Sequence, residues 1–378
     1  MRQALTNCRL VQDGALHHGS AIVMDDGVID GIVPAVDLAA EIPRHDLAGT
    51  ILAPGLIDIQ VNGGGGVLFN DAPTVEGICT IGAAHARFGT TGFLPTLISA
   101  DHDTIARAMD AVDAAIAAGV PGVLGIHVEG PFLNRSRRGI HDDTQFRALD
   151  AQAMALLVRP RRGRVVLTLA PEMVPPAAIR TLAEARVLVC AGHTEADFAT
   201  VRAALDAGMR GFTHLFNAMS QLGGRHPGAV GAALADTQSW CGLIADGHHV
   251  HPASLRVALA ARGLEKLILV TDAMPCVGTT DGQFQLQGRA ITVKDGVCRA
   301  ADGTLAGSDL DMISAVRNSM AMMSLSLPQA VQMASANAAA FLGLSDRTGA
   351  IAPGLRANFV VLDDELRLLE TWIDGCRQ

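Results

Sequence analysis

The chain has 378 residues, of which 49% are apolar and 18% charged, and a formal net charge of −9; these values are typical of a globular protein with room for one barrel and a smaller appendage. The acidic balance and the lack of a basic run argue against nucleic acid as a partner, and no apolar run is long enough to span a membrane. Lys266 and Lys294 are the only lysines, and neither follows a predicted strand where a Schiff-base nucleophile would have to lie.

The N-terminal sequence MRQALTNCRLVQDG lacks the apolar core of a signal peptide, so we expect a cytoplasmic protein. The seven cysteines are scattered along the chain and form no CxxC pair. An odd and dispersed set is typical of reduced, mostly buried thiols, and argues against a disulfide framework or a zinc knuckle.

Short β segments separated by turns are predicted at both ends of the chain. They occupy residues 1–50, with turns such as Asp26-Gly27, and again residues 350–378. We expect the two ends to pair in one small β-sandwich domain. The remaining residues, 51–349, would then form a second domain inserted between them.

Eight short runs rich in Val, Ile and Leu lie in this inserted region. They cover residues 56–62, 91–98, 123–131, 164–172, 186–194, 211–219, 240–250 and 267–274. Continuous apolar runs suit strands that are buried on both faces, as in a parallel sheet. Because helical patterns separate most of the runs, the expected fold is a (β/α)8 barrel of the TIM type.

Helices are predicted after most of these strands. They cover residues 74–88, 102–118, 196–207, 253–262 and 309–323, and Asp101 and Ser308 are plausible N-terminal caps. The alternation in residues 284–305 breaks this rhythm and predicts a β-hairpin inserted after the eighth strand. Such a hairpin would overhang the active-site face of the barrel.

A polar residue stands at or near the end of each apolar run. In chain order these residues are Gln60 and Asn62, Thr96, Glu129, Glu172, His193, His214, His249 and Asp272. Barrel enzymes carry their chemistry at the C-terminal ends of the strands. We therefore expect these side chains to converge on one site.

Three of these residues form a candidate metal site. Glu129, His193 and His214 supply one carboxylate and two imidazoles, a set that suits one divalent ion, Zn²⁺ best, with Fe²⁺, Mn²⁺ or Co²⁺ tolerable. With further positions left to water, the ion would be catalytic, since it would lower the pKa of that water to about 7. Asp272 is either an additional ligand or the general base and acid that moves the proton.

Three more residues are ambiguous when each is taken alone. Arg225 lies in GGRHPG, a loop that glycines hold open, and its guanidinium fork suits a phosphate or a carboxylate. For any single arginine, however, a solvated surface position is the more frequent explanation. His141 and His249 are open to the same two interpretations.

Motifs along the whole chain resemble those of a known family. PGLIDIQVNG (54–63) is similar to the first-strand motif of the amidohydrolase superfamily. Eight further motifs resemble, in the same order, those of the N-acetylglucosamine-6-phosphate deacetylase family: VEGPF (128–132), TLAPEM (168–173), AGHTEA (191–196), THLFNAM (213–219), GRHPG (224–228), ADGHHV (245–250), VTDAM (270–274) and GTLAGS (303–308). A β domain built from both termini is also that family's arrangement.

The resemblance implies a role for each residue that matches a motif. It makes Glu129, His193 and His214 the metal ligands, Asp272 the catalytic acid and base, and His141 a contact of the acetamido carbonyl. The remaining substrate contacts that it implies are Asn217, Ala218, Arg225, His249, Leu305, Ala306 and Gly307. Because the family completes its phosphate pocket across a homodimer interface, Arg225 and His249 would lie near that interface.

Two places depart from the patterns of relatives. Many amidohydrolases have a His-x-His pair where this chain has Gln60 and Asn62, and neutral amide oxygens are poor ligands for a transition metal. The fourth strand offers Glu172 and no lysine that could be carbamylated, so we expect a single metal ion. His226 stands where relatives often have glutamate, a change whose consequence the sequence does not reveal.

The expected activity is hydrolysis of the linear amide of N-acetyl-D-glucosamine 6-phosphate. Two other amidohydrolase activities remain open, because the metal and the aspartate would be shared: deacetylation of N-acetylgalactosamine 6-phosphate, and the hydrolysis of cyclic amides or N-acyl amino acids. A non-catalytic sensor of sugar phosphates is the alternative from a different class, and a complete ligand set argues against it.

Overall fold

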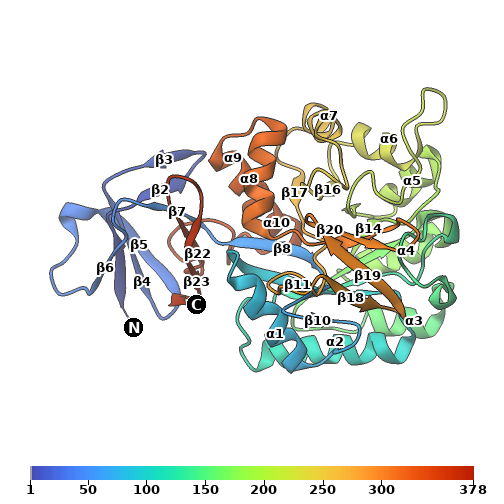
Figure 1. Ribbon diagram of the computed structural model, residues 1–378, viewed down its shortest axis with the longest axis horizontal. Helices are drawn as coiled ribbons and strands as arrows, with labels where there is room; N and C mark the ends of the chain where they lie inside the picture. Colours follow the sequence, from blue (N-terminus) through green and yellow to red (C-terminus); the bar gives the residue numbers. More distant parts are fainter. Residues whose placement is uncertain (1) are drawn as a thin grey trace.

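Eight parallel strands form a barrel in the larger part of the computed structural model, which describes residues 2–378 (Figure 1). Neighbouring strands follow one another in the chain, and the predicted (β/α)8 fold is confirmed. The strands are β8 (Leu56–Val61), β11 (Thr90–Ile98), β12 (Gly125–Glu129), β13 (Arg164–Leu169), β14 (Leu188–Ala191), β15 (Gly211–Phe212), β16 (Trp240–Leu243) and β17 (Leu267–Leu269). Their side chains are almost all buried, as expected for strands covered on both faces.

The barrel closes between its first and last strands, just beyond the end of β17. The backbone N–H of Asp272 donates to the carbonyl of Gln60 over 3.0 Å, and Val61 forms a parallel bridge with Ala273. This closure places the residues that follow β17 directly beside those that end β8.

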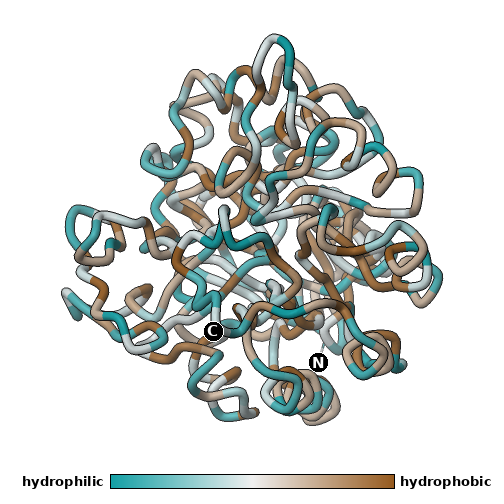
Figure 2. The backbone as a smooth tube through the Cα atoms, turned by 90° about the vertical axis from the view of Figure 1, so that its right-hand side faces the viewer, coloured by the Kyte–Doolittle hydropathy of each residue, from teal (hydrophilic) through white to brown (hydrophobic). Residues whose placement is uncertain are grey.

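Ten helices in residues 2–378 surround the barrel. They are α1 (Val75–Ala86), α2 (His102–Ala117), α3 (Ala151–Leu157), α4 (Pro176–Glu184), α5 (Phe198–Asp206), α6 (Gly228–Ala235), α7 (Pro252–Arg262), α8 (Met312–Met323), α9 (Leu327–Ala334) and α10 (Ala336–Leu342). Outer helices change between hydrophilic and hydrophobic along their turns (Figure 2), as amphipathic helices do. None of these helices combines the length and the apolarity that crossing a bilayer requires.

Two N-terminal capping residues were predicted, and the structure shows which residue caps each helix. Asp101 caps α2, where its carboxylate accepts from the backbone N–H of Thr104. The predicted cap Ser308 is wrong for α8, which is capped by Asp311. Ser308 instead ends a strand, and its hydroxyl donates to the carbonyl of Thr271 over 2.6 Å.

Two sheets built from both ends of the chain lie beside the barrel (Figure 1). One contains β1 (Gln3–Thr6), β4 (Ser20–Asp25), β5 (Val28–Pro34) and β6 (Arg44–Asp46); the other contains β2 (Arg9–Gln12), β3 (Ala15–His17), β7 (Ile51–Pro54), β22 (Phe359–Leu362), β23 (Leu368–Ile373) and β24 (Cys376–Arg377). A separate apolar core joins them, with Leu5 and Ile22 from the first sheet and Phe359 and Trp372 from the second. The exact domain boundaries, placed at 50 and 350, stay a prediction.

A further sheet follows the eighth barrel strand, where the alternation of residues 284–305 predicted a hairpin. It has four antiparallel strands, β18 (Gln283–Leu286), β19 (Arg289–Lys294), β20 (Val297–Ala300) and β21 (Leu305–Ser308). A short hairpin of β9 (Gly63–Gly64) and β10 (Val67–Leu68) lies after the first barrel strand. Through β21 the four-stranded sheet reaches the end of β17, since Ser308 pairs with Ala273.

Candidate functional site

A cavity of about 250 Å³ opens where the C-terminal ends of the barrel strands meet. It is lined by Asn62, Ile98, Glu129, Gly139, Ile140, His141, His193, His214, Asn217, Ala218, His249, Asp272, Met274, Thr304, Leu305 and Gly307. The strand ends thus bring together polar residues as far apart in the sequence as Asn62 and Asp272, which are 210 positions apart. The strand β21 of the inserted sheet supplies the opposite wall.

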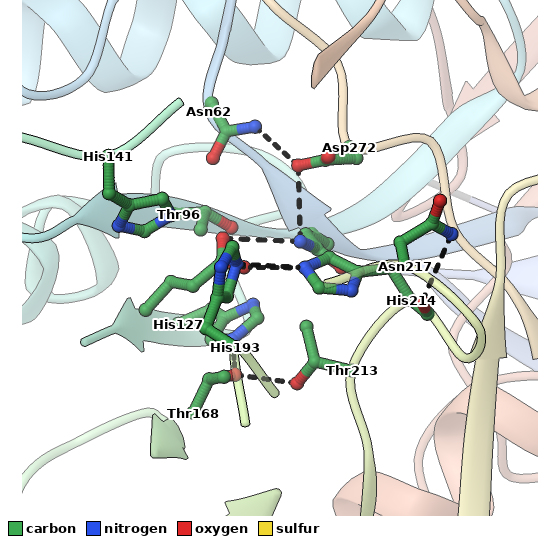
Figure 3. A network of polar contacts seen from close by, with 12 residues as sticks. Asn62, Thr96, His127, His141, Thr168, His193, Thr213, His214, Asn217 and Asp272 are labelled. Atoms are coloured by element: carbon green, nitrogen blue, oxygen red, sulfur yellow. Dashed lines mark hydrogen bonds and ion pairs between the residues drawn. The ribbon is translucent and has the colours of Figure 1, made fainter. Parts of the chain in front are cut away.

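Glu129, His193 and His214 converge on one point of this cavity, and Figure 3 shows the two imidazoles among them. Oε1 of Glu129 lies 3.1 Å from Nε2 of His193 and 3.0 Å from Nε2 of His214, and the two Nε2 atoms are 3.1 Å apart. Ligands at 2.0–2.1 Å around a tetrahedral ion are separated by about 3.3 Å. The triangle of donor atoms therefore fits a single divalent cation.

The electrostatics of the three side chains agree with that fit. All three are buried, and two imidazole lone pairs that face each other need a proton or a cation between them. Burial by itself would raise the pKa of Glu129, but the hydrogen bonds from His193 and His214 hold it well below its usual range. The carboxylate is thus kept ionised, as a ligand must be.

The backbone conformation is unusual at both imidazoles, and a second hydrogen bond orients the ring of His193. Nδ1 of His193 donates to the carbonyl of Arg137 over 2.9 Å, which leaves the Nε2 lone pair free for a metal. His193 and His214 both have positive φ angles, +50° and +33°. Such angles are uncommon outside glycine and occur at sites where the surrounding structure fixes an unfavourable conformation.

Asp272 lines the same cavity as the three candidate metal ligands (Figure 3). Its Oδ1 accepts from the side-chain amides of Asn62, over 2.7 Å, and Gln60, over 3.1 Å. The desolvation of Asp272 by the surrounding protein, followed by the charge of Glu129, raises the pKa of Asp272 above its usual value. An aspartate with a raised pKa that can still ionise is suited to taking up and releasing a proton.

The amide of Gln60 stands between two carboxylates. Its Nε2 donates to Oδ1 of Asp272 and, over 3.2 Å, to Oε2 of Glu129. The sequence indicated only that Gln60 and Asn62 are poor metal ligands. Their N–H groups are donors instead: the amide of Gln60 bridges Asp272 and Glu129, and the amide of Asn62 binds Asp272.

His141 reaches the cavity from the loop that follows β12. Its Nδ1 lies 2.8 Å from the hydroxyl of Ser99. Burial, followed by the charge of His193, lowers the pKa of His141 to about 3, so the ring is neutral at pH 7. If the hydroxyl of Ser99 donates to Nδ1, the proton of the ring is on Nε2, where it can be donated to a ligand.

His249 lies in the cavity of its own chain and has a partner that the sequence did not single out. Its Nδ1 is 2.6 Å from Oδ2 of Asp246, and Oδ1 of Asp246 accepts from the backbone N–H groups of His248 and His249. These hydrogen bonds lower the pKa of Asp246 against the opposing effect of burial. The spacing of aspartate and histidine three residues apart was the available signal.

The remaining predicted contacts divide into two groups. Asn217, Ala218, Leu305 and Gly307 line the cavity, whereas Ala306 is buried and does not line it. Arg225 is not at the cavity of its own chain: it lies exposed in the loop between His214 and α6. His249 lines the cavity of its own chain and Arg225 does not, so the phosphate site that both would share across subunits stays a prediction that a single chain does not test.

Glu172 and Thr96 end strands but do not join the cavity. Thr96 accepts from the backbone N–H of Val61. Glu172 accepts hydrogen bonds from three residues of two loops. Its carboxylate is thus occupied and offers no ligand to the ion.

Comparisons with known proteins agree along the whole length of the chain. The profile of the amidohydrolase family matches residues 51–375, and that of the NagA composite domain matches residues 3–52. The chain is 42% identical to the N-acetylgalactosamine-6-phosphate deacetylase of a Shewanella species, over 98% of this chain and 96% of the other.

Two solved structures are similar over nearly their full length. The N-acetylglucosamine-6-phosphate deacetylase of Pasteurella multocida has a TM-score of 0.97 and 30% identity over 100% of both chains. A mutant of the Mycobacterium smegmatis enzyme in complex with N-acetyl-D-glucosamine 6-phosphate has a TM-score of 0.91 and 32% identity over 100% of this chain and 99% of the other.

Proposed function

Since this chain belongs to the amidohydrolase family, we propose that it hydrolyses the amide of N-acetyl-D-glucosamine 6-phosphate to D-glucosamine 6-phosphate and acetate. The observation that carries the proposal is the convergence of Glu129, His193 and His214 with Asp272 in one cavity. The similarity to deacetylases over the whole chain, one of them in complex with this phosphosugar, supports the choice of substrate.

Glu129, His193 and His214 would hold one divalent ion, for which zinc is the best match to the ligands. When bound, such an ion lowers the pKa of a water toward about 7 and polarises a carbonyl group. Gln60 and Asn62 offer N–H groups to Asp272 where a second ion would need ligands. One ion per chain is therefore the proposed stoichiometry.

Asp272 moves the proton. Both amides that contact it bind Oδ1, so Oδ2 is the oxygen left to accept a proton from the attacking water. As the C–N bond of the amide breaks, the same carboxyl returns that proton to the nitrogen that leaves as an amine. Water and amide thus give acetate and amine, with Asp272 restored to its starting state.

His141 is placed to stabilise the oxyanion that develops on the acetyl carbonyl. Because its low pKa keeps it neutral, it acts as a hydrogen-bond donor from Nε2 and not as a charge. Removing one such donor typically lowers the rate by about 10²–10³-fold.

The sugar phosphate would be held at the far side of the cavity from the chemistry. His249 and Asn217 line that cavity in the same chain, whereas the exposed Arg225 is available to another subunit. We infer a homodimer in which Arg225 of one subunit binds the phosphate in the cavity of the other. Binding energy from the phosphate would then help to orient the acetamide.

A second candidate substrate is N-acetyl-D-galactosamine 6-phosphate. It is favoured by the 42% identity to a deacetylase named for that sugar. The two sugars differ at one hydroxyl, and a site that hydrogen-bonds a hydroxyl can discriminate strongly.

Acetate release from both phosphosugars, measured together with the metal content, tests the proposal. We expect release from the glucosamine derivative that depends on about one equivalent of a divalent ion. If kcat/KM were much higher for the galactosamine derivative, N-acetyl-D-galactosamine 6-phosphate would be the substrate in place of the glucosamine derivative. Release from neither sugar by the metal-loaded protein would refute the activity.

A further inference from the structure

Glu172 joins two loops that frame the metal ligand His193. It lies just beyond β13, in a short turn at Pro171–Met173. Oε1 accepts from the side-chain amide of Asn134 over 2.9 Å and from the backbone N–H of Glu195 over 2.7 Å, and Oε2 accepts from the hydroxyl of Thr194. One carboxylate thus takes hydrogen bonds from both loops.

The two loops hold different parts of His193: one continues its backbone, and the other hydrogen-bonds its carbonyl and its ring. Thr194 and Glu195 follow it directly in the chain, and Thr194 is fully buried. On the other side, the backbone N–H of Asn134 donates to the carbonyl of His193 over 3.0 Å. The same loop carries Arg137, whose carbonyl accepts from Nδ1 of the His193 ring.

His193 needs such support, because its conformation is not one that its own chain favours. Its φ angle is +50°, in the left-handed region that side chains other than glycine rarely adopt. A conformation of this kind persists only where the surrounding contacts determine it. The ring must also be held by its Nδ1 partner if Nε2 is to point to Glu129 and His214.

We propose that Glu172 is a positioning residue for the metal site, which fixes the two loops and thereby holds the imidazole of His193 in its ligating orientation. The proposal rests on the proposed function, because it takes His193 to be a metal ligand. Glu172 itself touches neither ion nor substrate. The donors to its carboxylate are the side-chain amide of Asn134, the hydroxyl of Thr194 and the backbone N–H of Glu195.

The test compares Glu172→Ala with the wild-type chain loaded with Co²⁺. Two quantities are measured: the dissociation constant of the ion, by competition with a chelator, and the visible absorption spectrum, which reports the ligand geometry. Removing a hydrogen-bond partner that orients a metal ligand typically lowers metal affinity about 10- to 100-fold. We expect a loss of affinity in that range and a changed spectrum in a chain that is folded by circular dichroism.

Asp197→Ala is the matched control. Asp197 lies four residues after His193, and its carboxylate caps α5 by accepting from the backbone N–H of Thr200 over 2.8 Å. Asp197 lies in the loop that follows His193, but its removal takes away only the capping hydrogen bond of α5 and none of the hydrogen bonds that Glu172 accepts. We expect Co²⁺ affinity within about twofold of wild type and an unchanged spectrum, since the hydrogen bonds of Glu172 and of the His193 ring are retained.

Glu172→Gln keeps the test decisive if the alanine variant does not fold. A glutamine has one acceptor oxygen for three donors, so we expect an intermediate loss of affinity, about 3- to 10-fold. Wild-type affinity and spectrum in every Glu172 variant that folds, the glutamine variant alone included, would overturn the role of Glu172. Failure of the wild-type chain to bind any divalent ion would instead overturn the proposed function.

Discussion

The side-chain amide of Asn62 donates a hydrogen bond of 2.7 Å to Oδ1 of Asp272. The two residues lie just beyond the first and last strands of the barrel and meet where the barrel closes. The bond assigns different tasks to the two carboxylate oxygens, because an oxygen that accepts N–H donors is a poor place for a proton. Oδ2 is left for proton transfer, and the first prediction follows from this division.

Asp272→Asn should bind the metal normally and lose turnover. Asparagine keeps an oxygen that can accept from Asn62, and Asp272 is not needed to complete the ligand triangle. Without a group that can carry the proton, we expect kcat to fall about 10²–10⁴-fold. Acetate release and metal content are measured on the same preparation; a near-normal kcat would refute the proton-transfer role, and a loss of metal would make Asp272 a ligand.

Arg225→Ala should weaken phosphorylated substrates selectively. An arginine that binds a phosphate contributes roughly 1.5–3 kcal/mol through charged hydrogen bonds, so kcat/KM for the phosphosugar should fall about 10- to 100-fold. Arg180→Ala is the matched control, since Arg180 is also exposed and lies on α4, away from the cavity. Unphosphorylated N-acetylglucosamine should be hydrolysed at an unchanged rate; if it suffered equally, the phosphate assignment would be wrong.

Mixing two impaired variants, with the phosphosugar as substrate, tests whether Arg225 acts across subunits. In a heterodimer of Asp272→Asn and Arg225→Ala, one site would carry both defects and the other neither. Random exchange at equal concentrations would give heterodimers in about half of the dimers, and hence native sites in about a quarter of all sites. We expect acetate release to recover to about that fraction of wild type after the subunits exchange. Size-exclusion chromatography of tagged subunits monitors the exchange. If the subunits exchange and acetate release does not recover, Arg225 acts within its own chain or not at all.

The sequence predicted the barrel and the metal ligands because both are encoded locally. Each strand is an apolar run, and the parallel arrangement brings the residues at their ends to one rim. The donor roles of Gln60 and Asn62 were not predictable, since they depend on the distance between side chains of the first, third and last strands. The contacts of Arg225 could not be predicted from the sequence either. Arg225 lies in an exposed loop, and no local sequence pattern indicates what such a loop binds.

The cap of α8 was missed for a different reason. Ser308, Asp309 and Asp311 are all residues with good capping propensity, so the local sequence does not choose among them. The choice is made by tertiary pairing: the backbone of Ser308 is bonded to Met274 and Asp272 at the closure of the barrel. The helix can begin only after that strand has ended.

A buried carboxyl below the site makes the stability of the protein depend on pH. Asp58, on β8, is fully buried. It accepts hydrogen bonds from the backbone N–H groups of Gln60 and Thr271 and from the hydroxyl of Thr271. Burial outweighs these bonds and raises the pKa of Asp58 to about 7, whereas the value in the unfolded chain is about 3.9.

The sign of the effect follows from proton binding. Between about pH 4 and pH 7 the folded chain holds a proton on Asp58 that the unfolded chain has released, so the contribution of Asp58 to the free energy of unfolding decreases as the pH rises through this range. A difference of about three pKa units corresponds to at most about 4 kcal/mol. Above pH 7 both states are ionised, and the contribution no longer changes.

Asp58→Asn should therefore flatten the dependence of stability on pH. Asparagine is neutral throughout and similar in shape, so the variant should lose less unfolding free energy than wild type between pH 5 and pH 7.5, by an amount of the order of 2 kcal/mol. Urea unfolding of the metal-free proteins measures this difference. Asp101→Asn is the control. The backbone N–H of Thr104 lowers the pKa of the exposed Asp101 carboxylate, so its contribution to the free energy of unfolding is lost only toward acid pH. The variant should therefore show the wild-type pH dependence between pH 5 and pH 7.5. If the free energy of unfolding changed with pH by the same amount in wild type and in Asp58→Asn, Asp58 would be ionised in the folded chain. Its three hydrogen bonds would then outweigh burial.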